Sequence, residues 1–283
     1  LLLHRAGVQA TVLERMTGPS GHPKARGVRT RTMELFARWG LGDAIRANGL
    51  PAEANRFIYC DSLAGEEIGR SAASDPLAEK LSPVNACRVA QDAVEEVLLH
   101  AVSKLDAVAV RRGANVVALD QDDDRVMLAT ESGERVVADF VIAADGVGST
   151  VRQLLGIELE GQPLLGYGQS VYWRGDLSPW VRDRQCIQFL TGHRLGRPAS
   201  IAPVDGVDRW VTMVIRPGKQ ARPEPPTPEE AVEIIRGAVG ADVDPQILDI
   251  ATWRLSAQVA TRWRVGRVFL AGDAAHSFPP TGG

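Results

Sequence analysis

Two apolar runs, each ending in a glycine beside an acid, constrain this chain more than any other feature. Residues 140–143 lead into Asp145-Gly146, and residues 267–270 lead into Gly272-Asp273. Such runs predict buried strands, and open α/β sheets bind their ligands at the carboxyl edge of their strands. Taken alone, the first run is better explained by a tight turn in which Ser149 caps the next helix. Both runs together predict acids and free backbone amides at a ligand-binding edge.

Helix and strand signals alternate at the two ends of the chain, whereas the middle is rich in strand signals. This order predicts an α/β nucleotide-binding domain with an inserted β-rich domain. Four helices are predicted. The first ends at Gly7, and the second is capped by Thr30 and runs to about Trp39. The third covers 94–105 after a capping box of Asp92 and Glu95, and the fourth is opened by Thr227, Pro228 and Glu230. The predicted strands cover 8–14, 108–111, 115–119, 126–130, 136–143, parts of 167–216, and 265–270, with a hairpin turn at 121–124.

Composition excludes several classes of protein. Of 283 residues, 45% are hydrophobic and the net charge is −3, which fits a globular protein and argues against a nucleic-acid binder. No apolar run approaches the roughly 20 residues that span a bilayer, and the opening Leu1-Leu2-Leu3 lacks the flanks of a signal peptide. The three cysteines are widely spaced, so we expect reduced thiols and a cytoplasmic location. The five histidines show no metal-ligand spacing, so we expect no metal site. We expect the natural protein to begin upstream, because no Met precedes residue 1.

The predicted strand 8–14 ends in Glu14-Arg15. In dinucleotide-binding folds an acid at this place accepts hydrogen bonds from the adenosine ribose, about 20 residues after a glycine-rich turn. Here that turn would lie before residue 1. A solvated strand end is the alternative explanation of this pair.

Taken together, these motifs resemble the FAD-dependent aromatic hydroxylases, the p-hydroxybenzoate hydroxylase-like flavoprotein monooxygenases of class A. The resemblance covers nearly the whole chain, and its specific residues are Asp145, Gly146, Ser149 and Arg152 of one motif, Gly272 and Asp273 of a second, and the loop Pro279-Pro280-Thr281-Gly282-Gly283. It implies an FAD-binding, Rossmann-like domain of the glutathione reductase type over 1–56, 88–162 and 262–283. A β-rich substrate domain over 57–87 and 163–261 would be interleaved with it. The family's first strand and its C-terminal part would then lie outside this sequence.

The resemblance also implies a set of residues that bind FAD. Glu14 and Arg15 would contact the ribose, Arg26 the diphosphate, and Asp273 the ribityl chain. For each arginine, a surface ion pair is the alternative. The full implied set is Glu14, Arg15, Arg26, Arg88, Gln91, Val116, Asp145, Gly146, Asp273, Pro280, Gly282 and Gly283.

The implied reaction is hydroxylation of an aromatic ring, phenolic or polyketide-like. NADH or NADPH would reduce the flavin, and reaction with O2 would give a C4a-hydroperoxide that transfers oxygen to the ring. Candidate walls of the substrate cavity are Tyr172, Trp173, Phe189 and Trp210, for which a place in the ordinary core is the alternative. No residue of the sequence identifies itself as a catalytic base.

Other activities fit the sequence less well. His276 beside Asp273 indicates no hydrolase, because no GxSxG turn accompanies it. A halogenase would carry a Trp-x-Trp-x-Ile stretch, which is absent, and the related epoxidases associate with membranes. A truncated, non-catalytic remnant that holds no FAD is a second hypothesis from a different class.

Overall fold

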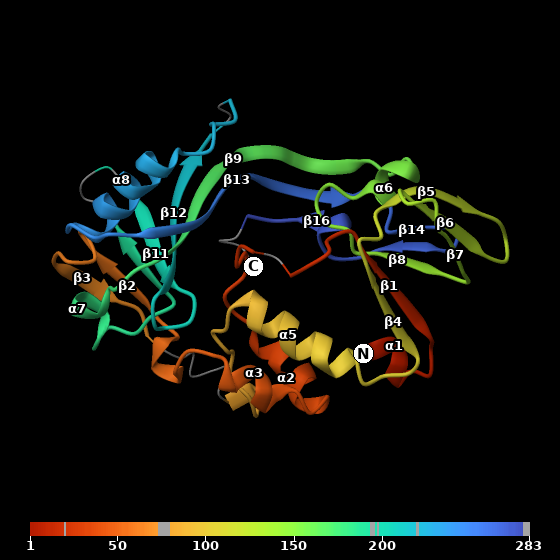
Figure 1. Cartoon of the computed structure of the whole chain (residues 1–283), viewed down its shortest axis with the longest axis horizontal. Coiled ribbons are helices and arrows are strands. Elements are labelled where there is room, and N and C mark those ends of the chain that lie inside the picture. Colours follow the sequence, from red (N-terminus) through yellow and green to blue (C-terminus); the bar gives the residue numbers. More distant parts are fainter. Residues whose placement is uncertain (20, 73–79, 193–195, 197, 219–220, 280–283) are drawn as a thin grey trace.

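The computed structural model describes residues 1–19, 21–72, 80–192, 196, 198–218 and 221–279. Strands dominate it, as the middle of the sequence predicts, and Figure 1 shows most helices below the sheets or at the outer left, with one at the upper right. The helices are α1 (Leu2–Arg5), α2 (Thr30–Arg38), α3 (Gly42–Ala47), α5 (Gln91–Val102), α6 (Thr150–Leu154), α7 (Ser178–Val181) and α8 (Pro228–Val239), with 3-10 turns η1 (Ala52–Ala54) and η2 (Gly272–Ala274). The predicted mixed α/β architecture is confirmed.

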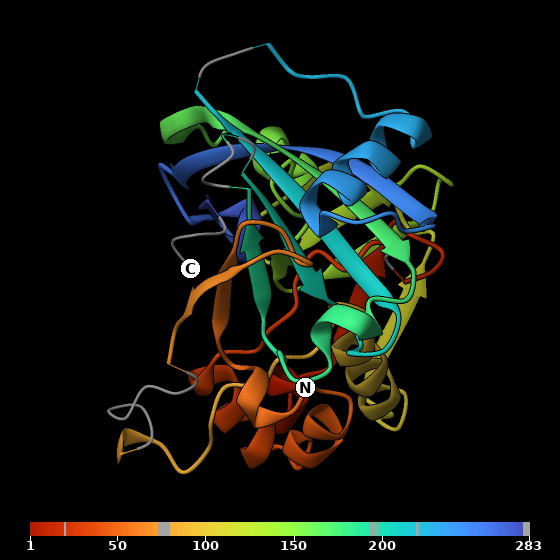
Figure 2. The same ribbon diagram turned by 90° about the vertical axis from the view of Figure 1, so that its left-hand side faces the viewer.

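An eight-stranded sheet forms one half of the molecule, in the order β16-β13-β9-β12-β11-β10-β2-β3. Figure 2 shows α8 lying across its outer face. Because side chains alternate along each strand, the sheet has an α8 face and an opposite inner face. Its strands are β2 (Phe57–Cys60), β3 (Glu67–Arg70), β9 (Leu159–Arg174), β10 (Gln188–Thr191), β11 (Ala199–Pro203), β12 (Arg209–Pro217), β13 (Gln246–Ala260) and β16 (His276–Ser277).

Three small sheets form the other half. β1 (Ala10–Glu14) pairs in parallel with β4 (Val108–Arg112), and β8 (Val141–Ala143) pairs in parallel with β15 (Val268–Leu270). Among the described residues, β1 has no partner besides β4 and β8 none besides β15, so each presents one open edge. The remaining strands are β14 (Arg264–Val265), antiparallel to β15, and the meander β5 (Val116–Gln121), β6 (Val126–Thr130) and β7 (Arg135–Ala138).

Two predicted strands are wrong in the same way: each is two strands. The run 136–143 divides into β7 and β8, which belong to different sheets. The run 265–270 divides into β14 and β15, which form a hairpin around Gly266 at φ 55°. Glycine adopts such positive φ values without strain, and this allows the reversal inside an apolar run.

Two predicted helix starts also need correction. Helix α2 is capped by Arg29, and Thr30 is its first helical residue. Helix α5 begins at Gln91, one position before Asp92, so the predicted capping box does not form. The Asp92 carboxylate instead accepts a hydrogen bond of 2.8 Å from Arg209 on β12.

The capping box of α8 is confirmed. The Thr227 hydroxyl accepts from the Glu230 backbone N–H at 3.3 Å, and the Glu230 carboxylate accepts from the Thr227 N–H at 2.9 Å. We expect Thr227→Ala to lower the free energy of unfolding by about 1 kcal/mol, because one helix N–H loses its partner. Urea denaturation measures this, and Thr227→Ser should restore most of the loss. Equal stability of the alanine and serine variants would contradict the prediction.

The three cysteines are free and buried. Burial raises the pKa of the Cys186 thiol to about 12 and also raises the pKa values of Cys60 and Cys87. An exposed thiol titrates near pH 8.5, so at that pH the thiolate share is larger in the unfolded chain than in the native one. We therefore expect a thiol reagent at pH 8 to label the native chain far more slowly than the urea-unfolded chain. Equal labelling rates would show that the thiols are accessible.

Candidate functional site

The two glycine–acid motifs lie side by side in the structure. β8 and β15 run in parallel with Ala143 opposite Leu270, so Asp145 and Asp273 follow the same edge of the same sheet. The Ala271 N–H donates to the Ala143 carbonyl at 2.9 Å, which continues the pairing up to the motifs. Both acids are exposed. This edge therefore offers two carboxylates to a ligand from outside the sheet.

The turn after β8 is both a helix-capping turn and part of the predicted ligand-binding edge, the two explanations that its sequence allows. Gly146 has φ 83°, and Ser149 caps α6 by accepting from the Arg152 N–H at 3.0 Å. Asp145 accepts from the Ser149 hydroxyl and, at 3.0 Å, from the Val151 N–H. The cap is therefore real, and the same contacts fix the Asp145 carboxylate at the edge.

Arg152 joins the two motifs. Its guanidinium donates to the carbonyl of Ala274 in η2 and to that of Val147, both at 3.1 Å, and the residue is 6% exposed. Among the described residues Arg152 forms no ion pair, and its guanidinium N–H groups donate to backbone carbonyls of both turns. The relative position of the two acids thus depends on this side chain.

The end of β1 meets the start of β5. The Glu14 carbonyl accepts from the Ala114 N–H at 2.9 Å, two residues before Val116. The Glu14 carboxylate accepts from the Met16 N–H at 2.7 Å, and Arg15 is exposed. The structure therefore brings together Glu14 and the neighbourhood of Val116, as a site for one nucleoside requires.

The irregular segment 21–27 brings Arg26 beside Gln91 and Arg88. Gln91 holds the loop through two bonds with Ala25, one from its backbone N–H at 3.0 Å and one to its side-chain oxygen at 3.2 Å. A Cβ on Gly27 would lie 2.6 Å from Arg88 Nη1, so the glycine makes room for that guanidinium. A hollow of 650 Å³ lies here, lined by Arg26, Gly27, Arg29, Thr30, Arg31, Phe57, Ala86, Arg88, Ile187 and Gln188.

This hollow is strongly cationic. The Nε of Arg26 is buried and has no hydrogen-bond partner among the described residues, and burial lowers the pKa of Arg26 to about 10. Burial and the neighbouring Arg29 lower the pKa of Arg88 as well. A bound anion would satisfy the orphaned donor and offset the cost of the buried charge. The residues therefore fit the diphosphate of a dinucleotide.

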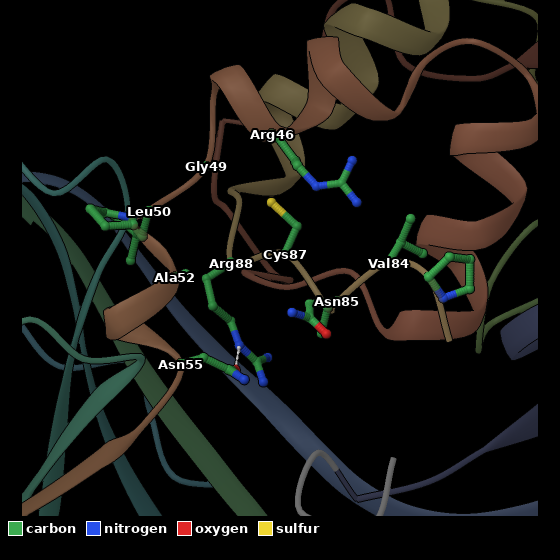
Figure 3. A pocket seen from close by; sticks show the side chains of 12 residues that line it. Arg46, Gly49, Leu50, Ala52, Asn55, Val84, Asn85, Cys87 and Arg88 are labelled. Carbon is green, nitrogen blue, oxygen red and sulfur yellow. Dashed lines mark hydrogen bonds between the residues drawn. The ribbon is translucent and has the colours of Figure 1, made fainter. Parts of the chain in front are cut away.

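Figure 3 shows a second hollow, of 690 Å³, on the α3 side of Arg88. The Arg88 Nε donates to the Asn55 side-chain oxygen at 2.8 Å, and Arg46 extends along the same hollow. Arg88 thus separates the two hollows, and its bond to Asn55 fixes it between them.

The inner face of the large sheet carries a polar network that no sequence pattern predicted. His22 of the segment 21–27 contacts Asp249 on β13 at 2.7 Å and Ser170 on β9 at 3.1 Å. Tyr172 of β9 lies beside it and accepts from Arg209 at 3.2 Å. No spacing or motif in the sequence links these residues, since their partners are far apart along the chain.

The four candidate cavity walls do not lie together. Trp173, Trp210 and Phe189 are at most 2% exposed and belong to the core on the α8 face, with Ala231 and Ile235 of α8. Tyr172 points to the inner face, where it packs with Ala90, Val204 and Val211. This placement favours the core explanation for the first three and leaves Tyr172 as a candidate.

Three of the implied cofactor contacts, Pro280, Gly282 and Gly283, lie outside the described residues. Within the described chain, no three His, Cys, Asp or Glu side chains gather as a metal site would require. No helix of this part combines the length and apolar character needed to cross a membrane.

Comparison with known proteins gives a consistent result. Residues 1–283 match the FAD binding domain family. The whole chain is 35% identical to 56% of an aklavinone 12-hydroxylase of Streptomyces purpurascens and 32% identical to 54% of a 4-methyl-5-nitrocatechol 5-monooxygenase of Burkholderia sp. An aklavinone-11 hydroxylase solved with FAD and aklavinone superposes with a TM-score of 0.86 at 33% identity, over 99% of this chain and 55% of that one. The chain thus spans about half the length of these relatives.

Proposed function

The chain belongs to the FAD-binding domain family, and from this premise we propose that the whole protein is an FAD-dependent monooxygenase. Its substrate would be an aromatic compound, phenolic or polyketide-like, hydroxylated with NADH or NADPH and O2. The observation that carries the proposal is the shared edge of β8 and β15, where Asp145 and Asp273 lie together. The named activities of the relatives support the same class of reaction. A cytoplasmic location fits a consumer of reduced nicotinamide.

The chain's own residues have distinct tasks in this proposal. Arg26 and Arg88 hold the diphosphate, Glu14 with the start of β5 holds the adenosine, and Asp273 holds the ribityl chain. FAD, when bound, supplies the redox chemistry with NAD(P)H and O2. The protein orients the substrate ring and excludes water from the reacting atoms.

The inner face of the large sheet is the proposed substrate side. Besides Tyr172 it carries Met213, and towards β2 it carries Phe57 and Tyr59, which are 37% and 42% exposed. Phe57 also lines the hollow that contains Arg26 and Arg88, so the apolar surface of the sheet adjoins this cationic hollow. A flat aromatic substrate fits such a surface, because aromatic side chains stack on planar rings.

The test is to express the complete product of the gene and record its visible absorption after gel filtration. We expect a yellow protein that oxidises NADH or NADPH faster with an aromatic substrate. Mass spectrometry should show one oxygen from ¹⁸O2 in the product. A colourless protein that ignores added FAD would overturn the proposal, and an epoxide or a halogenated product would reassign the reaction.

A second candidate function is favoured by the open edges of β1 and β8: this chain alone is a fragment that holds no flavin. Parallel strands are normally buried and paired on both sides, so further strands would be expected beside β1 and β8 in a complete cofactor-binding sheet. The same absorption measurement on residues 1–283 decides it. A yellow fragment would contradict this candidate, and a colourless one beside a yellow complete product would support it.

Arg26 offers a more local test in the complete protein. We expect Arg26→Met to weaken FAD binding about 10- to 100-fold, because a buried charge-assisted bond to the diphosphate is lost. Fluorescence titration of the apoprotein with FAD measures this. Arg31→Met is the matched control, since Arg31 lines the same hollow but pairs with Glu34 at 2.6 Å. An unchanged dissociation constant for Arg26→Met would remove Arg26 from the site.

A further inference from the structure

Two polar bridges connect the inner face of the sheet to the two segments that carry the cofactor residues. In the first, His22 of the Arg26 loop contacts Asp249 and Ser170. In the second, Arg209 on β12 contacts Asp92, the residue after Gln91, at 2.8 Å. Each bridge therefore ends within a few residues of a proposed FAD contact.

The directions of the hydrogen bonds in the first bridge follow from the groups involved. A carboxylate only accepts, so His22 Nδ1–H donates to Asp249 Oδ2. The Ser170 hydroxyl lies 3.1 Å from Nε2 and can serve either form of the ring, because a hydroxyl both donates and accepts. His22 is 9% exposed and Ser170 3%, so the bond between them is shielded from water, whereas the Asp249 side chain is 45% exposed.

The second bridge is anchored on both sides of Arg209. Its Nε donates to Asp205 at 2.7 Å, while its Nη1 serves Asp92 and the Tyr172 hydroxyl. These bonds hold the guanidinium in one place and raise the pKa of Arg209 above its ordinary value. Helix α5 is thereby fixed against the sheet at its first turn.

The two bridges meet at Tyr172. Its ring contacts His22 edge to face, with centroids 5.8 Å apart, and its hydroxyl accepts from Arg209. The residue is 7% exposed and lies on the proposed substrate side. One aromatic side chain therefore touches both connections between the sheet and the cofactor segments.

From these contacts we infer that His22 and Arg209 are positioning residues, which fix the distance between the substrate side and the FAD-binding segments. The inference rests on the proposed function and deepens it. Each acts by holding a segment in place, His22 the irregular loop of Arg26 and Arg209 the start of α5. A misplacement of about 1 Å between two reacting groups can cost about 100-fold in rate, so such contacts matter for turnover.

The test uses the complete protein with FAD bound and compares His22→Ala, His22→Asn and His22→Gln. Asparagine retains a donor near Nδ1 for Asp249, whereas glutamine retains a polar group near Nε2 for Ser170. We expect His22→Ala to lower kcat about 10- to 100-fold with little change in KM, and to raise the share of NAD(P)H oxidised without product. His22→Asn should recover most of this loss, because the charge-assisted bond is the stronger one.

One further variant removes the hydroxyl through which Tyr172 contacts Arg209, and another serves as a control. Tyr172→Phe keeps the ring contact with His22 and removes the acceptor of Arg209, so a smaller loss of coupling is expected. Asp208→Asn is the control: this carboxylate pairs with Arg174 at 3.1 Å on the same sheet but belongs to neither bridge. It should match the wild type in kcat and coupling.

Wild-type kcat and coupling in His22→Ala would overturn the inference. So would an asparagine variant as impaired as the alanine variant, because that pattern indicates general loss of structure. If the wild type binds FAD but hydroxylates no phenolic or polyketide-like compound, the proposed function fails and the flavin absorption bands still test the inference. A shift of the bands in His22→Ala, reversed in His22→Asn, would then support it, and unshifted bands would overturn it.

Discussion

Trp173→Ala is expected to lower the free energy of unfolding by about 3–5 kcal/mol, the usual cost of truncating a large buried aromatic side chain. Trp173 is fully buried on the α8 face, in the same hydrophobic core as Trp210. Its Nε1 donates to the Thr212 hydroxyl at 2.9 Å. Truncation would leave a cavity and an unsatisfied hydroxyl. Urea denaturation followed by far-ultraviolet circular dichroism measures the loss.

The same variant also tests whether Trp173 belongs to the hydrophobic core or to the wall of the substrate cavity. We expect the folded fraction of Trp173→Ala to keep the substrate affinity of the wild type, because the side chain points away from the inner face. Trp173→Phe should restore part of the stability and serves as the matched control. An alanine variant of wild-type stability that no longer binds substrate would move Trp173 into the cavity wall.

Arg152→Ala is expected to cost about 2–5 kcal/mol of stability. Its guanidinium is buried and donates to two backbone carbonyls, and each carbonyl loses its partner in the variant. Because these carbonyls belong to the turns of Asp145 and Asp273, FAD binding should weaken as well. Arg135→Ala, at an exposed position of β7, should change stability by no more than about 0.5 kcal/mol.

Lysine at position 152 sharpens this test. A lysine keeps the charge but presents one ammonium, so it cannot reproduce the fork that reaches both turns. We therefore expect Arg152→Lys to recover little of the loss. Full recovery of stability and FAD affinity by lysine would show that charge, and not the two-carbonyl geometry, is what the site requires.

The sequence predicted those parts of the fold that depend on neighbouring residues. The strand β6 and the capped start of α8 occur at their predicted positions, since alternation and capping are local patterns. The start of α5 was wrong because Asp92 has a partner 117 residues away, on β12. No local pattern can show that an acid in a first turn bonds to a distant arginine.

The candidate site divides in the same way. Asp145 and Asp273 were found from motifs, and the sheet register places them at one edge. The His22 network joins residues 148 and 227 positions apart, so it appears only once the chain is folded. Aromatic residues in strands could not be assigned to a face before the register was known, which is why three of four candidate walls lie in the core.

The two longest strands determine how the molecule can move. β9 and β13 pair along nearly their whole lengths, and Figure 1 shows them running from the large sheet to the small ones. A relative movement of the two halves would have to bend this double-stranded ribbon, and its ladder is already interrupted by the register shift between Leu255 and Ala257. The two halves are therefore coupled through one ribbon, and we expect any bending between them to occur at this irregularity.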